Sequence, residues 1–262
     1  MLKIAFDPIY KHQLKIGHRF PMEKYELLPE NLLRKNICNS DNFFSPLPIE
    51  KQLLLSTHDE GYYNNLINLS LPKLHARQIG FPLSEALIMR EHVIAQGTIQ
   101  NTHYAQQYGV SMNIAGGTHH AFRDRPGAFC MLNDQAIASN YLIDNNLAKR
   151  VMIVDLDVHQ GDGTASIFEH QDSVFTISFH GQKNYPFKKQ NSDFDLSFDD
   201  NTEDRAYLNA LENHLPRLID LVEPDFMFYL AGVDVLETDK LGRLGLSMAG
   251  CKARDRFVLG LC

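Results

Sequence analysis

Residues 151–163, Val-Met-Ile-Val-Asp-Leu-Asp-Val-His-Gln-Gly-Asp-Gly, carry the pattern that decides the fold. The run opens with four apolar residues, and apolar side chains then alternate with acids as far as Val158. A short apolar run that is closed by Gly and Asp predicts a buried strand followed by a turn. The end of this strand carries Asp155, Asp157 and His159, which are side chains able to bind a metal or to move protons.

Similar apolar segments alternate with helical patterns on both sides of this run. Strands are predicted at 2–6, 110–115, 151–158, 174–179 and 226–235, and helices at 22–35, 84–107, 133–144 and 202–222, the last capped by Thr202. Such alternation is typical of a mostly parallel sheet with helices on both faces. We therefore expect an α/β fold of three layers, α-β-α, with residues 1–262 forming one domain.

Polar residues follow three of the predicted strands at the point where each strand ends. Gly116-Gly117-Thr118-His119-His120 follows one, the Asp155–Gly163 segment follows the second, and Gly232-Val233-Asp234 follows the third. Ligands of open α/β sheets bind beyond the carboxyl ends of the strands. The sequence therefore predicts that acids and histidines from three strand ends meet in one site.

A metal site is predicted from Asp157, His159 and Asp234. Asp157 and His159 are two residues apart at a strand end, so their side chains point the same way. Asp234 supplies a third ligand from another strand, and three protein ligands leave a position open for water, as in catalytic zinc sites. A calcium loop is excluded because Gln160 occupies the sixth position, where that loop requires Gly.

The tandem histidines His119 and His120 are predicted to transfer protons. A neutral histidine beside a metal-bound water can accept its proton, and a charged one can protonate a leaving amine. Each needs a carboxylate on its other nitrogen to fix the tautomer. Asp155 and Asp162 are the acids available for that role.

Composition excludes several other classes of function. The chain has 25 Lys and Arg against 32 Asp and Glu, a net charge of -7, which argues against a nucleic-acid binder. No apolar run approaches the about 20 residues that span a bilayer, so no membrane partner is expected. The start of the chain is unlike a signal peptide, and its four cysteines form no CxxC pair. These features predict a cytoplasmic protein, and they leave its oligomeric state open.

The motifs resemble those of the histone deacetylase family, and most closely those of its short bacterial and class IV-like members. The similarity runs through residues 17–25, 116–121, 129–134, 154–164, 178–180 and 231–234 in the family's order. The resemblance implies an arginase/deacetylase fold with an eight-stranded parallel sheet. It implies a zinc ion, with Fe²⁺ as the alternative, bound by Asp157, His159 and Asp234.

The same resemblance assigns roles to residues around the metal. It implies that His119 is backed by Asp155 and His120 by Asp162. It also implies a structural potassium ion, held by Asp155 and Ser178 and by backbone oxygens of Asp157, His159 and Phe179. Phe129 would form one wall of an acyl-lysine channel, and Tyr185 or Phe187 the other. The implied reaction is hydrolysis of an acyl amide in acyl-lysine or another N-acyl amine.

Three alternatives accompany this hypothesis. An arginase-like site with two metals is disfavoured because Gly161 stands where that pattern needs an acid. A deacetylase of acetylpolyamines or other small N-acetyl compounds would share the zinc site. The third alternative is a catalytically impaired relative. Family members carry an oxyanion-binding tyrosine in a Gly-Gly-Gly-Tyr-type motif, and no such motif follows residues 254–259 of this sequence. On this ground the domain is expected to be incomplete at its C-terminus and to lack its last strand. A second departure from the family pattern is Ala128, which stands where the family usually has Gly.

Overall fold

The computed structural model describes all residues, 1–262, as two compact units, Met1–Leu142 and Ile143–Cys262. All of their paired strands run parallel, as the sequence predicts. The strands form one three-stranded and one four-stranded sheet, whereas the resemblance implies a single sheet of eight.

The first unit contains the smaller sheet, in the order β2-β1-β3, and most of the helices. Its strands are β1 (Lys3–Ala5), β2 (Phe43–Phe44) and β3 (Ser111–Asn113), and its helices are α1 (Lys24–Arg34), α2 (Lys51–Leu55), α3 (Glu60–Ile67), α4 (Lys73–Ile79), α5 (Glu85–Tyr108) and α6 (Asp134–Asp144), with short 3-10 turns at Pro8–Tyr10 and Ser40–Asn42. Helix α5 packs on β1 and β3. It begins where the Ser84 side chain accepts a hydrogen bond from the Leu87 amide, and it ends at Gly109.

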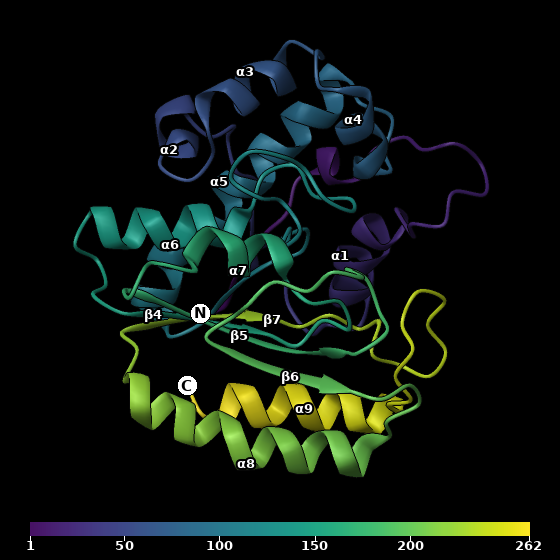
Figure 1. Ribbon diagram of the computed structural model, residues 1–262, viewed down its shortest axis with the longest axis vertical. Helices are drawn as coiled ribbons and strands as arrows, with labels where there is room; N and C mark the ends of the chain where they lie inside the picture. The colour runs from purple at the N-terminus through teal and green to yellow at the C-terminus, as the bar shows by residue number, and fades with distance from the viewer. The chain divides into compact units, whose positions relative to one another are not determined.

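The second unit is built on the larger sheet, in the order β6-β5-β4-β7. Its strands are β4 (Val151–Asp155), β5 (Val174–Gly181), β6 (Phe194–Phe198) and β7 (Phe226–Leu230), and its helices are α7 (Asp162–Phe168), α8 (Asp204–Val222) and α9 (Met248–Gly260). Helices α8 and α9 lie side by side against one face of the sheet, and α7 lies on the other (Figure 1). Across both units, none of the helices combines the length and the apolar character that crossing a membrane requires.

The core of the second unit shows how β4 positions its polar residues. Met152, Val154, Leu156 and Val158 are fully buried in one cluster with side chains of α8 and α9. The alternation of side chains therefore persists for three residues beyond Asp155, where the hydrogen-bonded ladder with β7 ends. Intervening residues are directed away from this core, and among them are the acids that the sequence analysis singled out.

Some predicted boundaries are wrong. Strand β4 stops at Asp155 instead of Val158, because the Asp155 carboxylate itself accepts the next free amide, that of Asp157, at 3.0 Å. Strand β7 stops at Leu230 instead of residue 235. Thr202 does not cap α8: its hydroxyl donates to the Asp199 carbonyl oxygen at 2.8 Å. The N-cap residue is Glu203, whose side chain makes no capping bond.

Candidate metal centre

Two adjacent strand ends carry the three predicted metal ligands. Strands β4 and β7 are parallel neighbours whose last paired residues are Asp155 and Leu230. Asp157 and His159 follow β4, and Asp234 follows β7, so all three lie beyond the same edge of the sheet. Two neighbouring parallel strands thus bring together residues that are 75 or more positions apart in the sequence.

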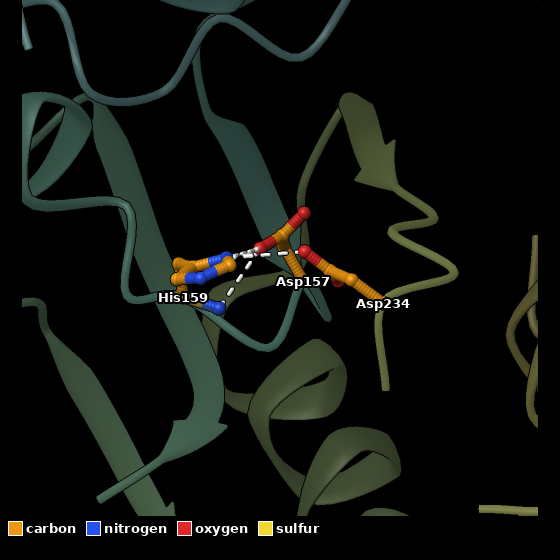
Figure 2. A group of neighbouring side chains, drawn as sticks. All are labelled: Asp157, His159 and Asp234. Atoms are coloured by element: carbon orange, nitrogen blue, oxygen red, sulfur yellow. Dashed lines mark hydrogen bonds and ion pairs between the residues drawn. The ribbon is translucent and has the colours of Figure 1, made fainter. Parts of the chain in front are cut away.

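The three side chains face one another closely (Figure 2). His159 Nδ1 lies 3.0 Å from Asp157 Oδ1 and 3.0 Å from Asp234 Oδ2. One ligand atom from each residue falls within 4.8 Å of the other two. The structure therefore brings together the triad that the sequence analysis predicts.

Backbone hydrogen bonds fix the turn that presents these ligands. The amide of His159 donates to Asp157 Oδ1 at 2.8 Å, and the amide of Val158 donates to Asp234 Oδ1 at 3.1 Å. The Val158 carbonyl oxygen accepts from the Gly181 amide at 2.8 Å. Since both carboxylates are oriented by main-chain donors, the ligand atoms are held in place by the fold as well as by one another.

Two glycines allow the close approach of these segments. A Cβ at Gly232 would run into Asp157 Oδ2 and would stand 2.7 Å from Asp157 Cα. A Cβ at Gly242 would overlap the carbonyl oxygen of Asp234. The Asp157 and Asp234 segments are therefore packed against backbone that has no room for a side chain.

The two carboxylates of the triad favour a positive charge between them. Burial alone would lower the pKa of His159, but its hydrogen bonds with Asp157 and Asp234, and their charges, raise that pKa to about 10. Burial, followed by the negative charge of Asp157, raises the pKa of Asp234. Two carboxylates and one imidazole are a donor set that zinc accepts, and three such ligands leave a coordination position open. The residues present thus fit the ion that the sequence predicts.

In the first unit, the predicted proton-transfer pair occupies a buried turn after β3. His119 and His120 are both buried, and their ring centroids are 4.1 Å apart. The turn is entered through Gly117, whose φ of +91° is a conformation that favours glycine. The acids that the resemblance assigns to them, Asp155 and Asp162, belong to the second unit, where both are buried.

The buried carboxylate of Asp134 holds this turn. Its Oδ1 accepts the amides of Gly117 and Thr118 at 3.0 and 2.8 Å, and the Thr98 hydroxyl donates to its Oδ2 at 2.6 Å. A Cβ at Gly116 would stand only 2.8 Å from the same Oδ2. The sequence analysis assigned no role to Asp134. Its position at the start of a predicted helix, where an acidic side chain is favourable, was the available indication that it has one.

His58, which sequence analysis also missed, ties together both ends of the loop that follows the histidine pair. Its Nδ1 lies 2.9 Å from the Phe122 carbonyl oxygen, and its Nε2 lies 3.0 Å from the Asn133 amide nitrogen. Because an amide can only donate, Nε2 is the acceptor and Nδ1 carries the proton. No pattern near His58 in the sequence indicates these contacts, which span 64 and 75 positions.

Comparison with known proteins identifies the family. The histone deacetylase domain matches residues 18–262, a span that includes parts of both units. The chain belongs to the histone deacetylase family. Membership supports a hydrolase of the deacetylase type.

Individual relatives agree with this assignment. The chain is 39% identical over 259 residues to an uncharacterized protein of Picosynechococcus sp., covering 99% of this chain and 86% of that protein. It is 27% identical over 250 residues to histone deacetylase 2 of Arabidopsis thaliana, covering 92% of this chain and 65% of the plant protein. The crystal structure of a histone deacetylase homologue from Aquifex aeolicus matches with a TM-score of 0.88 at 25% identity, covering 99% of this chain and 76% of that chain. This likeness confirms the predicted α/β fold of the arginase/deacetylase type.

The residues that the family resemblance assigns to potassium lie on two neighbouring strands of the second unit, β4 and β5, or just beyond the end of β4. Asp155 of β4 pairs in register with Ser178 of β5, and both are buried. The Ser178 hydroxyl lies 3.0 Å from His180 Nδ1. Phe179 is fully buried and its ring packs in the core, so only its backbone oxygen is available for an ion.

The predicted channel residues are distributed over both units. Phe129 lies in the first unit, where its ring contacts those of Phe20 and Phe81 at centroid distances of 5.0 and 4.9 Å. Tyr185 and Phe187 lie in the second unit with ring centroids 6.5 Å apart. Phe187 is 90% exposed, which is unusual for a large apolar side chain.

Proposed function

We propose that this chain is a zinc-dependent deacylase that hydrolyses the amide bond of acyl-lysine or of another N-acyl amine. The observation that carries the proposal is the convergence of Asp157, His159 and Asp234 at two adjacent strand ends. Membership of the histone deacetylase family supports the reaction class.

Asp157, His159 and Asp234 are the proposed ligands of zinc. When bound, zinc lowers the pKa of a water molecule and polarises the acyl carbonyl. The two carboxylates balance the charge of a divalent ion, and the main-chain bonds to both keep their oxygens oriented while ligands exchange. Asp155 and Ser178, with backbone oxygens of Asp157, His159 and Phe179, are proposed to hold potassium as a structural ion.

His119 and His120 are the proposed proton-transfer residues. His120 accepts a proton from the attacking water as the bond to the acyl carbon forms. A histidine of the pair then donates a proton to the amine nitrogen as the carbon–nitrogen bond breaks. The proposed partners are Asp155 for His119 and Asp162 for His120, each fixing a tautomer. The rigid turn around the pair supports this role, because proton transfer depends on fixed orientation.

Aromatic side chains are proposed to contact the apolar part of the substrate. Phe129 would contact one side of the acyl-lysine stem and Tyr185 or Phe187 the other. The exposure of Phe187 supports such a role, since a large apolar side chain in water gains by covering an apolar ligand. Small N-acetyl amines are the second substrate class to be compared. The cytoplasmic location stays a prediction.

The test removes the metal and then the ligands. Chelated protein should lose hydrolysis of acetyl-lysine and longer acyl-lysine reporters and regain it with zinc or, as the alternative, with Fe²⁺ under anaerobic conditions. Asp157→Ala and His159→Ala should lose bound metal and activity, whereas His120→Ala should retain metal and lose activity. Asp172→Ala changes an exposed acid of the same unit and is the matched control. Hydrolysis that survives complete removal of metal would contradict the proposal.

A further inference from the structure

Arg254 is a charged side chain in an unusual position. It lies on α9, its exposed fraction is 0%, and it ranks among the largest fully buried side chains of the chain. A buried guanidinium is costly unless its donors are satisfied. Its partners therefore indicate what the fold gains from it.

The partners of Arg254 are the backbone segments that lead to the metal ligands. Nη1 donates to the carbonyl oxygen of Leu156 at 3.1 Å and to that of Gly232 at 2.7 Å. Leu156 immediately precedes Asp157, and Gly232 lies two residues before Asp234. One nitrogen atom thus joins the two strand ends that supply all three ligands.

These carbonyls lie where the sheet no longer supplies partners. The register of β4 with β7 ends at Asp155 and Leu230, and the Leu156 amide still donates to the Leu230 carbonyl oxygen at 3.1 Å. Beyond that bond, two further contacts join the strand ends: the Val158 amide donates to Asp234 Oδ1, and Arg254 donates to a carbonyl oxygen on each side. The guanidinium therefore continues the connection between the strands past the last ladder bond.

The guanidinium is itself anchored from its other side. Nε donates to Asp255 Oδ1 at 2.9 Å, and Nη2 forms an ion pair with the same oxygen at 2.8 Å without a hydrogen bond of its own. The hydroxyl of Tyr229, on β7, donates to that oxygen at 2.6 Å. Because the planar guanidinium holds its donors in a fixed fork, Asp255 on one edge determines where Nη1 points on the other.

We propose that Arg254 is a positioning residue for the metal centre, which sets the separation of the Asp157 and Asp234 segments and thereby the affinity for zinc. The inference rests on the proposed function only in taking zinc as the resident ion. Arginine is required because one group must donate to two carbonyls and to a carboxylate in fixed geometry. A lysine ammonium is a point charge without that fork.

The experiment measures zinc affinity and stability separately. Apoprotein of the wild type, Arg254→Met and Arg254→Lys is titrated with zinc against a fluorescent chelator, and thermal unfolding of each apoprotein is recorded. Arg254→Met should weaken zinc binding by about 10-fold or more, the range seen when groups behind metal ligands are removed. Arg254→Lys should give a smaller loss of zinc affinity. If Arg254→Met does not fold, the zinc affinity of Arg254→Lys is the deciding measurement. Arg256→Met, an exposed arginine of the same helix, should bind zinc as the wild type does.

The outcomes separate positioning from general stability. A purely structural Arg254 would lower the unfolding temperature of the apoprotein and leave the zinc Kd of the folded variants within twofold of the wild-type value; that result overturns the inference alone. An equal loss in Arg256→Met also overturns it. A wild-type chain that binds no zinc would overturn the proposed function together with this inference.

Discussion

Replacing His58 by glutamine should flatten the pH dependence of stability in the acid range. His58 is 1% exposed, and its Nε2 accepts the Asn133 amide. Protonation would place one N–H against another and charge a side chain that burial isolates from water. Burial accordingly lowers the pKa of His58 to about 4, from 6.5 in the unfolded chain, although the Phe122 carbonyl oxygen opposes the shift.

The sign and size of the effect follow from these two values. Because the pKa of His58 is lower in the folded protein, the unfolded chain binds the additional proton on acidification. The contribution of neutral His58 to the free energy of unfolding is therefore fully present well above pH 6.5 and is lost as the pH drops toward 4. Between about pH 7.5 and about pH 5, this one linkage removes about 2 kcal/mol from the free energy of unfolding. Glutamine does not titrate, and it retains an oxygen that can accept from Asn133.

Urea unfolding at these two pH values measures the effect as a double difference. Other titrating groups are common to both proteins and cancel when the pH-induced losses are subtracted. The His58→Gln protein should be less stable at neutral pH, but it should lose about 2 kcal/mol less on acidification than the wild type. His170→Gln, at an exposed histidine, should keep the wild-type loss. If wild type and His58→Gln lose the same free energy, the argument from burial and tautomer is wrong.

Two further predictions concern the glycine and carboxylate contacts. Gly232→Ala should weaken zinc binding by about 10-fold, because its Cβ would displace Asp157. Gly61→Ala, at a position where a Cβ meets nothing within 4 Å, should leave the zinc affinity unchanged. Competition with a chelator measures both affinities, and equal values for the two variants would contradict the packing argument. Asp134→Ala should lower the free energy of unfolding by about 2 to 4 kcal/mol in urea titrations, since two amides and a hydroxyl lose their acceptor. Asp134→Asn, which keeps one carbonyl oxygen for the amides, should recover part of this, and a loss equal to that of alanine would show that the hydrogen bonds are not the cause.

The metal ligands were predictable from sequence because their geometry is local or follows from a general rule. Asp157 and His159 share a side because strand side chains alternate, and Asp234 joins them because parallel strands end at a common edge. Each inference needs only the strand that precedes the residue. The start of α5 at Ser84 was predictable for the same reason, since a cap acts on its own helix.

The supporting residues were not predictable, because their roles depend on contacts distant in sequence. Arg254 contacts a carbonyl 98 positions away, and His58 contacts an amide 75 positions away. Nothing within their own helices or loops distinguishes them from exposed residues of the same type. The prediction that Thr202 caps α8 was wrong for a related reason. Its hydroxyl donates to the Asp199 carbonyl oxygen instead, and residue propensities do not report such competition between local hydrogen bonds.

The buried cluster of Met152, Val154, Leu156 and Val158 constrains how this segment can evolve. Even-numbered residues of this segment enter the apolar core, and odd-numbered residues carry the acids and the histidine. An insertion or deletion of one residue would exchange the two sets, sending Asp157 and His159 toward α8 and α9 and the aliphatic residues to the metal side. A substitution among the four aliphatic residues changes one contact, whereas a change of length by an odd number exchanges the two faces of the segment, so we expect the length of 152–158 to be kept more strictly than the identity of its aliphatic residues.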